Sequence, residues 1–256
     1  MTETLALGVR APLHPRLAAL RRLAIIPAYN EAEVIASVID EIRNVDSEFE
    51  VVVVDDGSTD GTAQIAEQAG ARTVRLPFNL GIGGAMQTGY QYARDRGFQL
   101  AIQVDGDGQH DPNEFARLVE PILEGRADMV VGSRFIRKRL YQGSLKRRLG
   151  IQLFARAVSI IVGQRITDPT SGFRAVNRRA ICLFAGDYPH DYPEVEATVL
   201  LFRHRLTMVE VPVRMRLRTS GRSSITALRS IYYMVKVSLA LFISLFRRYP
   251  TPLEER

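Results

Sequence analysis

The chain has 256 residues, of which 46% are hydrophobic, so it can bury a sizeable core as one domain and is unlike a disordered chain. Its single cysteine, Cys182, excludes an internal disulfide framework and lies in an apolar run that indicates a buried thiol in a reducing compartment. The net charge is +6, and basic residues cluster in segments 129–167 and 211–253, which hold nine and eight Lys or Arg, while the rest of the chain is net acidic.

Apolar strands and amphipathic helices alternate along the first half of the chain. A buried strand is expected at 23–28, an amphipathic helix at 31–44, and a second strand at 50–56 whose four valines indicate burial on both faces. A turn and a helix to residue 69 follow. The pattern continues with a strand at 72–76, a helix at 83–96, a strand at 100–105, a helix at 113–124 and a strand at 128–132. This alternation predicts an α/β sandwich with a mostly parallel sheet.

Polar clusters follow three of the predicted strands. They are Pro27-Ala28-Tyr29-Asn30-Glu31, Asp55-Asp56 and Asp105-Gly106-Asp107. Because ligands of open α/β sheets bind at the carboxyl ends of the strands, the three clusters favour a nucleotide site. The first cluster lacks the glycine fingerprint of a dinucleotide fold, and the chain has no Walker phosphate loop.

The third cluster has the character of a metal-diphosphate site. In extended backbone the side chains of Asp105 and Asp107 point the same way and can converge on one hard divalent cation that bridges phosphates. Gln109 supplies a third possible oxygen ligand. Asp111 followed by Pro112 is typical of an N-cap and the first position of a helix. The simpler alternative is a polar turn between a strand and a helix.

Together these motifs resemble glycosyltransferase family 2, and most closely its polyprenyl-phosphate branch, which is similar to dolichyl-phosphate mannose synthase. The resemblance covers about residues 23–225. It rests on Ile26-Pro27-Ala28-Tyr29-Asn30-Glu31, Val54-Asp55-Asp56-Gly57-Ser58-Thr59-Asp60, Asn79-Leu80-Gly81, the Asp105 motif, Gly132-Ser133-Arg134 and Asp168-Pro169-Thr170-Ser171-Gly172-Phe173-Arg174. It implies a GT-A fold, a Rossmann-like three-layer sandwich, and inverting transfer from a nucleotide-sugar donor with Mg²⁺ or Mn²⁺.

The resemblance also implies roles for individual residues. It assigns Pro27, Tyr29, Glu31 and Asp56 to the pocket for the base and ribose, with Asp105 adjoining it. It assigns Asp105, Asp107 and Gln109 to the metal and the diphosphate. The donor is then a UDP-, GDP- or dTDP-sugar, because sequence alone names neither the base nor the sugar.

A segment near the end of the chain resembles the family's Arg-x-x-Gly-x-Ser-Lys element, which closes over phosphates. Here Arg218 and Ser223 match the element, but Ser224 stands in the position of the lysine. Arg222 could replace that cation from two residues earlier, binding phosphate through a planar fork. Alternation of arginines with apolar residues over 213–218 is also typical of an exposed strand face, the interpretation favoured for Arg214.

Two acceptors fit these residues. A polyprenyl phosphate is already an anionic nucleophile at neutral pH, so it needs no strong base, and Arg134 and Arg174 could hold its phosphate. A glycan hydroxyl needs a general base, which Glu194 or Glu196 could supply. The simpler role for one of these glutamates is to cap the helix that follows. His110 and His190 lack metal-ligand spacing, so turn hydrogen bonding is expected of them.

Two apolar segments with basic flanks, 135–166 and 231–246, have the character of interfacial helices rather than membrane spans. We therefore expect an extension without a secretory signal at 1–22, a GT-A domain at 23–225 and a membrane-associating helix at 226–256. The enzyme is then cytoplasmic and peripheral, bound to an anionic membrane surface, which leaves room for an integral-membrane partner. Alternatively, the two helices pack on the sheet or form a homo-oligomer interface.

Three other classes of function fit less well. A sugar nucleotidyltransferase should open with a glycine-rich loop after its first strand, which this chain lacks. A nucleic-acid-binding module would explain the basic segments but not the carboxylates at the strand ends, so no nucleic-acid partner is expected. A catalytically inactive nucleotide sensor would not need the intact Asp105-Gly106-Asp107 motif.

Overall fold

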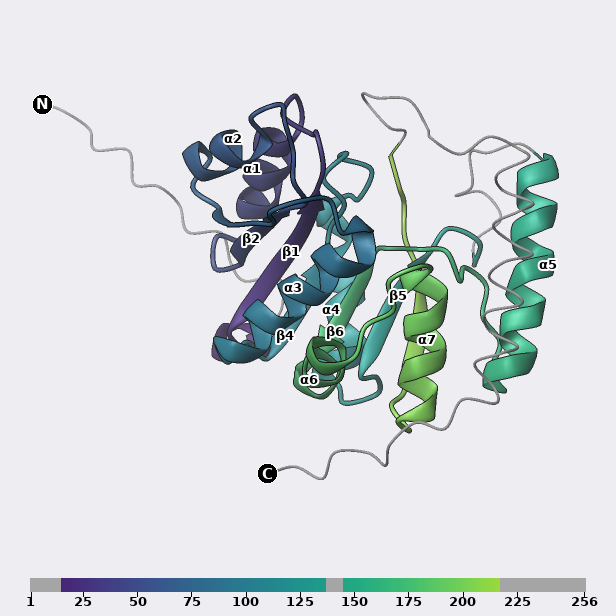
Figure 1. Cartoon of the computed structure of the whole chain (residues 1–256). Coiled ribbons are helices and arrows are strands. Elements are labelled where there is room, and N and C mark those ends of the chain that lie inside the picture. The colour runs from purple at the N-terminus through teal and green to yellow at the C-terminus, as the bar shows by residue number, and fades with distance from the viewer. Residues whose placement is uncertain (1–14, 137–144, 217–256) are drawn as a thin grey trace, which may run out of the picture.

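Seven strands and seven α-helices make up the described part of the chain, residues 15–136 and 145–216 of the computed structural model (Figure 1). The strands are β1 (Arg22–Ala28), β2 (Glu50–Asp55), β3 (Arg72–Arg75), β4 (Leu100–Gln103), β5 (Met129–Ser133), β6 (Arg174–Asn177) and β7 (Met208–Pro212). The helices are α1 (Ile35–Val45), α2 (Thr62–Gln68), α3 (Gly81–Asp95), α4 (Phe115–Leu123), α5 (Leu145–Val162), α6 (Arg178–Gly186) and α7 (Pro193–Arg203), with 3-10 turns at Pro15–Ala19 and Pro112–Glu114.

The strands form one mixed sheet in the order β3-β2-β1-β4-β6-β5-β7. All neighbours pair in parallel except β6, which runs antiparallel to both β4 and β5. The prediction of a mostly parallel α/β sheet is therefore confirmed. Because β6 is reversed, its first residue, Arg174, lies at the edge of the sheet where the parallel strands end.

Helices cover both faces of the sheet, and each face has its own hydrophobic core (Figure 1). On β2 the side chains of Val52 and Val54 enter the core that contains α3 and α6, whereas Val51 and Val53 enter the core that contains α1 and α4. Side chains of successive strand residues point to opposite faces. The valine run of β2 is therefore buried on both faces, as the sequence predicts.

The predicted bounds of the elements agree with the structure to within a few residues, but one small difference changes how the site is built. The strand predicted at 100–105 ends at Gln103, and residues 106 and 107 lie in a turn. The side chains of Asp105 and Asp107 are therefore placed by a turn, not by extended backbone as predicted. The N-cap prediction is confirmed, since the Asp111 carboxylate accepts a hydrogen bond from the Asn113 N–H at 3.1 Å.

The described residues include no helix that is long and apolar enough to cross a membrane. Residues 1–14, 137–144 and 217–256 lie outside the description. The domain bounds predicted at residues 22 and 225 stay predictions.

Asp128, just before β5, ties the ends of three strands together. Its carboxylate accepts hydrogen bonds from the Thr207 N–H at 2.8 Å, the Thr207 hydroxyl at 3.0 Å and the Asn177 amide at 2.8 Å, and pairs with Arg179 at 3.2 Å. Burial alone would raise the pKa of Asp128, but these contacts together hold the pKa below its ordinary value.

We expect Asp128→Asn to lower the free energy of unfolding by about 2 kcal/mol at pH 7, because an amide cannot replace all of these contacts. A carboxyl group whose pKa is lowered by folding stabilises the fold above its unfolded-state pKa, and this contribution is lost as pH falls through the folded-state pKa. The difference between the variant and the parent should therefore shrink below about pH 4. Urea unfolding at pH 7 and at pH 3 measures it, and a difference that did not change with pH would contradict this assignment.

Candidate active site

The loops after β1 and β2 are joined by hydrogen bonds at the carboxyl edge of the sheet. The side-chain oxygen of Asn30 accepts a hydrogen bond from the Thr59 N–H at 2.9 Å, and the Asn30 N–H donates to the Ser58 hydroxyl at 2.9 Å. Asn30 has a φ of 55°, a left-handed conformation that asparagine tolerates better than most residues. The structure thus brings the predicted nucleotide-site residues Tyr29 and Glu31 beside the loop after β2.

Asp56 anchors the start of α3. Its two carboxylate oxygens accept hydrogen bonds from the Leu80 N–H at 2.7 Å and the Gly81 N–H at 2.9 Å, and the residue is 4% exposed. Burial raises the pKa of Asp56, and the two backbone hydrogen bonds oppose this shift. Asp56 therefore has a structural task in addition to the predicted contact with the base, which stays a prediction. Pro27 lies within β1, and Tyr29 is exposed.

The turn that carries Asp105 and Asp107 packs closely on the end of β1. A Cβ atom added at Gly106 would lie 3.3 Å from the Pro27 carbonyl oxygen, so a glycine allows this approach. Within the turn, the Asp107 Oδ1 atom accepts a hydrogen bond from the Gln109 N–H at 3.0 Å. Asp105 and Asp107 are both partly exposed, so their carboxylates can reach a ligand at the surface.

His110 holds the same turn through a hydrogen bond to its backbone. Its Nδ1 atom accepts a hydrogen bond from the Asp105 N–H at 3.0 Å, and its ring stacks on Phe173 with 4.5 Å between the ring centroids. Because Nδ1 accepts this hydrogen bond, it carries no proton of its own, and burial lowers the pKa of His110. The predicted role of His110 in turn hydrogen bonding is confirmed.

The segment after β7 lies across the turn. His110 and Met215 form an isolated antiparallel bridge, and the Arg216 N–H donates to the Gln109 carbonyl at 2.8 Å. The Arg216 side chain pairs with both Asp111, at 2.9 Å, and Glu41 on α1. Arg214 is exposed, as predicted, whereas the role of Arg216 was missed because its partners are far away in the sequence.

The donor set of the turn fits a divalent cation that is shared with a substrate. The described residues contain no group of three or more His, Cys, Asp or Glu side chains that could hold a metal ion alone. Mg²⁺ is usually held by one or two carboxylates together with substrate phosphates and water. Asp105 and Asp107 supply two carboxylates, which fits such a site, and Gln109 follows two residues later with an amide oxygen.

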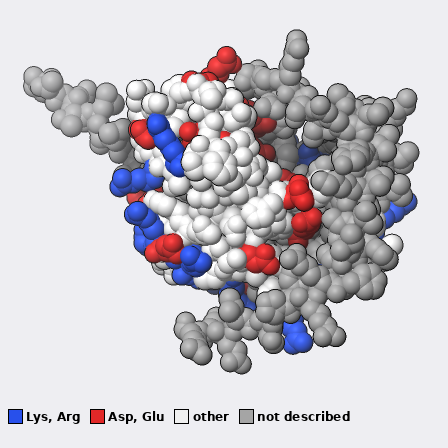
Figure 2. Space-filling model, viewed as in Figure 1, with Lys and Arg blue, Asp and Glu red and all other residues white. Residues whose placement is uncertain are grey.

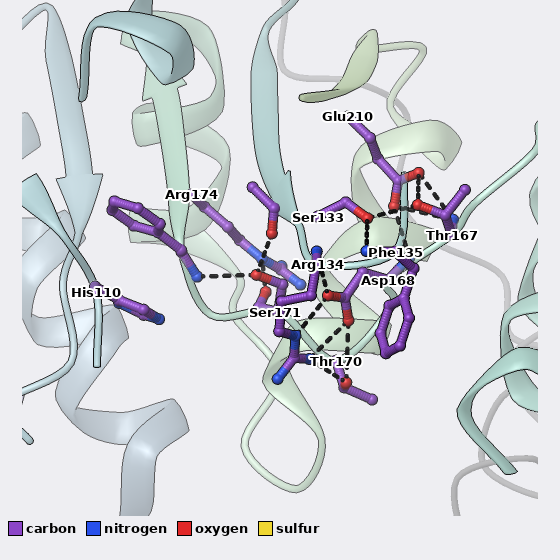
Figure 3. Close-up of polar contacts among 12 residues, drawn as sticks. His110, Ser133, Arg134, Phe135, Thr167, Asp168, Thr170, Ser171, Arg174 and Glu210 are labelled. Carbon is purple, nitrogen blue, oxygen red and sulfur yellow. Dashed lines mark hydrogen bonds and ion pairs between the residues drawn. The ribbon is translucent and has the colours of Figure 1, made fainter. Parts of the chain in front are cut away.

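Arg134, at the end of β5, is clamped by a fully buried aspartate. Its Nε and Nη2 atoms donate to the two oxygens of Asp168 at 2.7 and 2.8 Å, and Nη2 also donates to the Thr170 hydroxyl at 3.0 Å (Figure 3). Asp168 is 0% exposed, and the Arg134 side chain is 20% exposed. The guanidinium group is therefore held in one orientation at the edge of the site.

Arg174 is almost fully buried at the start of β6. It is 2% exposed and donates from Nε to the Ser171 carbonyl at 2.8 Å and from Nη2 to the Glu194 carbonyl, while its Nη1 atom is buried without a hydrogen-bond partner. Gly172 allows the loop before β6 to pack against the turn that carries Asp105 and Asp107, since a Cβ atom there would lie 3.3 Å from Asp105 Oδ1. The loop that leads into Arg174 therefore packs against the Asp105 turn.

Glu194 lies in the same charged cluster. Burial raises the pKa of Glu194, and the positive charge of Arg174 opposes the shift. Glu194 and Glu196 both lie in the first turn of α7, whose N-cap is Tyr192, so neither occupies the capping position considered from the sequence. Arg218, Arg222, Ser223 and Ser224 lie outside the described residues, as does the predicted helix at 226–256.

An open pocket with apolar, polar and basic lining residues lies next to the Arg134 clamp. It has a volume of about 750 Å³ and is bounded by α5 and by segment 163–167, with Phe135 at one side. Its lining includes the apolar residues Phe135, Ala155, Ile160 and Ile166 and the basic residues Arg156 and Arg165. Two of the lining residues, Phe135 and Thr167, are the chain neighbours of Arg134 and Asp168, so the pocket adjoins the clamp.

A model of the family described as Glycosyl transferase family 2 matches residues 23–184. The chain belongs to this family. The protein is therefore a glycosyltransferase, and the resemblance seen in its motifs is confirmed.

Several relatives of this family 2 glycosyltransferase carry names that specify lipid phosphates. The chain is 31% identical over 216 residues to an undecaprenyl-phosphate mannosyltransferase of Micrococcus luteus, covering 81% of this chain and 88% of the relative. It is 29% identical over 228 residues to a polyprenol monophosphomannose synthase of Mycolicibacterium smegmatis, covering 85% and 86%. These matches confirm the resemblance to the polyprenyl-phosphate branch of the family.

Solved structures of similar fold confirm the GT-A architecture of this glycosyltransferase. Glucosyl-3-phosphoglycerate synthase from Mycobacterium tuberculosis, in complex with Mn²⁺, UDP and glucosyl-3-phosphoglycerate, superposes with a TM-score of 0.70. It is 24% identical in sequence, and the match covers 91% of this chain and 82% of that one. At this identity the likeness establishes the fold alone.

The surface of the glycosyltransferase carries charge of both signs. Figure 2 shows basic side chains along the left of the view and acidic side chains over its upper and central parts.

Proposed function

We propose that this glycosyltransferase moves a sugar from a nucleotide-sugar donor to a polyprenyl phosphate, with inversion at the sugar, at the cytoplasmic face of a membrane. The observation that carries the proposal is a juxtaposition. The Asp105–Asp107 turn, suited to a diphosphate and its cation, lies at the same sheet edge as two arginines, Arg134 and Arg174, suited to a second phosphate. Relatives named for transfer to polyprenyl phosphates span most of the chain.

On the donor side, Asp105, Asp107 and Gln109 would hold Mg²⁺ or Mn²⁺ against the diphosphate. The bound cation would neutralise the charge that develops on the departing nucleoside diphosphate. The protein's own part is to keep the turn rigid, through the His110 hydrogen bond and the Arg216 clamp. Pro27, Tyr29, Glu31 and Asp56 would form the pocket for the base and ribose.

On the acceptor side, a phosphate monoester carries a charge of about −1.5 to −2 at neutral pH, so its oxygen is a nucleophile without help from a base. That oxygen attacks the anomeric carbon of the donor sugar, the bond from this carbon to the diphosphate breaks, and the bond's electrons leave with the nucleoside diphosphate. A single displacement inverts the configuration. Arg134 and Arg174 would bind and orient the acceptor phosphate, and Arg218, Arg222 and Ser223 would contact phosphate from the segment that follows.

The open pocket beside Arg134, with its apolar lining residues, supports a lipid acceptor. An isoprenoid chain attached to a phosphate at Arg134 could pass along Phe135 into this pocket beside α5, whose lining also includes Arg156 and Arg165. The same basic residues suit an anionic membrane surface. The enzyme would attach peripherally to this membrane surface, with an integral-membrane partner or as a homo-oligomer.

The second candidate is transfer to a glycan hydroxyl, and the observation that favours it is Glu194. A general base for a hydroxyl is more effective when its pKa is raised toward neutrality, and burial raises the pKa of Glu194. A lipid phosphate acceptor makes such a base unnecessary.

Glu194→Gln separates the two acceptors. For a phosphate acceptor we expect kcat to stay within about tenfold of the parent, whereas loss of a required base would lower it by about a hundredfold or more. Glu196→Gln serves as the matched variant two residues along α7. Initial rates with saturating donor and acceptor measure both, and a hundredfold loss in Glu194→Gln would favour the glycan hydroxyl.

The function itself is tested by release of nucleoside diphosphate from a panel of UDP-, GDP- and dTDP-sugars, with and without polyprenyl phosphate and Mg²⁺ or Mn²⁺. We expect one donor to be turned over only when both lipid phosphate and metal are present. Binding of donor and metal without any stimulation by lipid phosphate would contradict the proposed acceptor.

A further inference from the structure

Glu210, on the edge strand β7, binds the segment that carries Asp168. Its carboxylate accepts hydrogen bonds from the Thr167 N–H at 2.8 Å, the Asp168 N–H at 2.8 Å and the Thr167 hydroxyl at 2.8 Å (Figure 3). These three donors lie on two consecutive residues. One carboxylate therefore fixes both the position and the direction of the backbone at residues 167 and 168.

Hydrogen bonds connect the Glu210 carboxylate to the two chain neighbours of Arg134. Thr167 Oγ1 lies 2.6 Å from the Ser133 hydroxyl, which in turn accepts a hydrogen bond from the Phe135 N–H at 3.2 Å. The Asp168 carboxylate accepts a hydrogen bond from the Arg134 backbone N–H, at 3.1 Å, in addition to those from its guanidinium group. Figure 3 shows Glu210, Thr167 and Ser133 on one side of this network and the Arg134 fork with Asp168 on the other.

The rigidity of Arg134 depends on the position of Asp168. In a bidentate pair between arginine and carboxylate, two parallel hydrogen bonds fix both the position and the orientation of the guanidinium group. Asp168 is fully buried, so a displaced carboxylate could not be compensated by water. A shift of residues 167 and 168 would therefore move the arginine.

We infer that Glu210 is a positioning residue for the acceptor phosphate, acting through Asp168 on Arg134. The inference rests on the proposed function, in which Arg134 binds that phosphate. Glu210 itself touches neither substrate nor metal in this account. Its removal should weaken acceptor binding while the donor site and the chemical step are kept.

The chain offers a matched control. Asp128 is a buried carboxylate just before β5 that accepts hydrogen bonds from the N–H and the hydroxyl of Thr207, much as Glu210 does from Thr167. Its hydrogen bonds lie just before β5 and β7, at the opposite end of β5 from Arg134. Asp128→Asn should therefore disturb folding as Glu210→Gln does, without moving Arg134.

The test compares steady-state kinetics of Glu210→Gln, Asp128→Asn and Arg134→Lys with polyprenyl phosphate as the varied acceptor. For Glu210→Gln we expect the acceptor KM to rise about tenfold, with kcat and the donor KM within about twofold of the parent. Arg134→Lys should raise the same KM by at least as much. Asp128→Asn should lower the thermal midpoint while leaving the acceptor KM unchanged.

Thr167→Val provides a second variant if Glu210→Gln folds poorly, because it removes one hydroxyl and keeps the carboxylate. It should raise the acceptor KM in the same direction by a smaller factor. An unchanged acceptor KM in Glu210→Gln, with a raised one in Arg134→Lys, would overturn the positioning role alone. Absence of turnover of polyprenyl phosphate by the parent protein, or an unchanged KM in Arg134→Lys, would overturn the proposed function and the inference with it.

Discussion

Asp107→Asn is expected to lower kcat/KM by about a thousandfold, because it removes one of the two carboxylates that would hold the cation against the diphosphate. The fold should survive. Asp107 Oδ1 accepts a hydrogen bond from the Gln109 N–H, and an asparagine oxygen in the same place can accept it too. The loss should therefore appear in activity and in Mn²⁺ binding, and not in the free energy of unfolding.

Asp95→Asn is the matched control, since it makes the same chemical change at the exposed last residue of α3, outside the site. Rates of nucleoside diphosphate release and Mn²⁺ binding followed by electron paramagnetic resonance give two independent measurements. Asp107→Asn activity within tenfold of the parent, with unchanged Mn²⁺ binding, would show that the turn is not the metal site.

Arg174→Met should have the second largest effect, and it should appear in both stability and activity. The substitution removes the arginine donor of the Ser171 carbonyl and one of the donors of the Glu194 carbonyl, and it removes the positive charge near the Glu194 carboxylate. Loss of the hydrogen bonds of this buried guanidinium group should cost about 3 kcal/mol. We also expect kcat/KM to fall about a hundredfold, because a phosphate held by arginine loses a charged hydrogen bond.

The control for Arg174→Met is Arg178→Met. Arg178 also donates to backbone carbonyls, at Arg94 and Phe98, but it lies at the opposite end of β6. It should lose stability without a comparable loss of kcat/KM. Urea unfolding and initial rates compare the two variants, and equal losses of activity in both would assign Arg174 a purely structural role.

Local patterns predicted much of the fold because the sheet is mostly parallel and buried. The alternation of strands and helices to residue 132 and the valine run of β2 both follow from burial, which the local sequence records. The reversed direction of β6 could not be predicted in this way. It is a four-residue strand whose pairing with β4 and β5 is set by distant parts of the chain.

The candidate site, too, could be predicted from the sequence only in part. The carboxylates at the strand ends could be predicted because neighbouring parallel strands end at one edge. The turn at Asp105–Asp107 was predicted as extended, since nothing local showed that β4 ends at Gln103. Glu210 was missed because its hydrogen bonds reach 42 and 43 residues along the chain. The available signal was a charged residue in the middle of the short apolar strand Met208–Pro212.

The most direct test of the central claim is the identity of the product. The purified protein would be incubated with its preferred nucleotide sugar, Mg²⁺ and polyprenyl phosphate, and the organic-soluble product analysed by mass spectrometry and by NMR of the anomeric centre. The account predicts a single sugar joined to a polyprenyl monophosphate, with the anomeric configuration inverted relative to the donor. Consumption of the donor with the sugar found only on water or on a glycan, and none on the lipid, would contradict it.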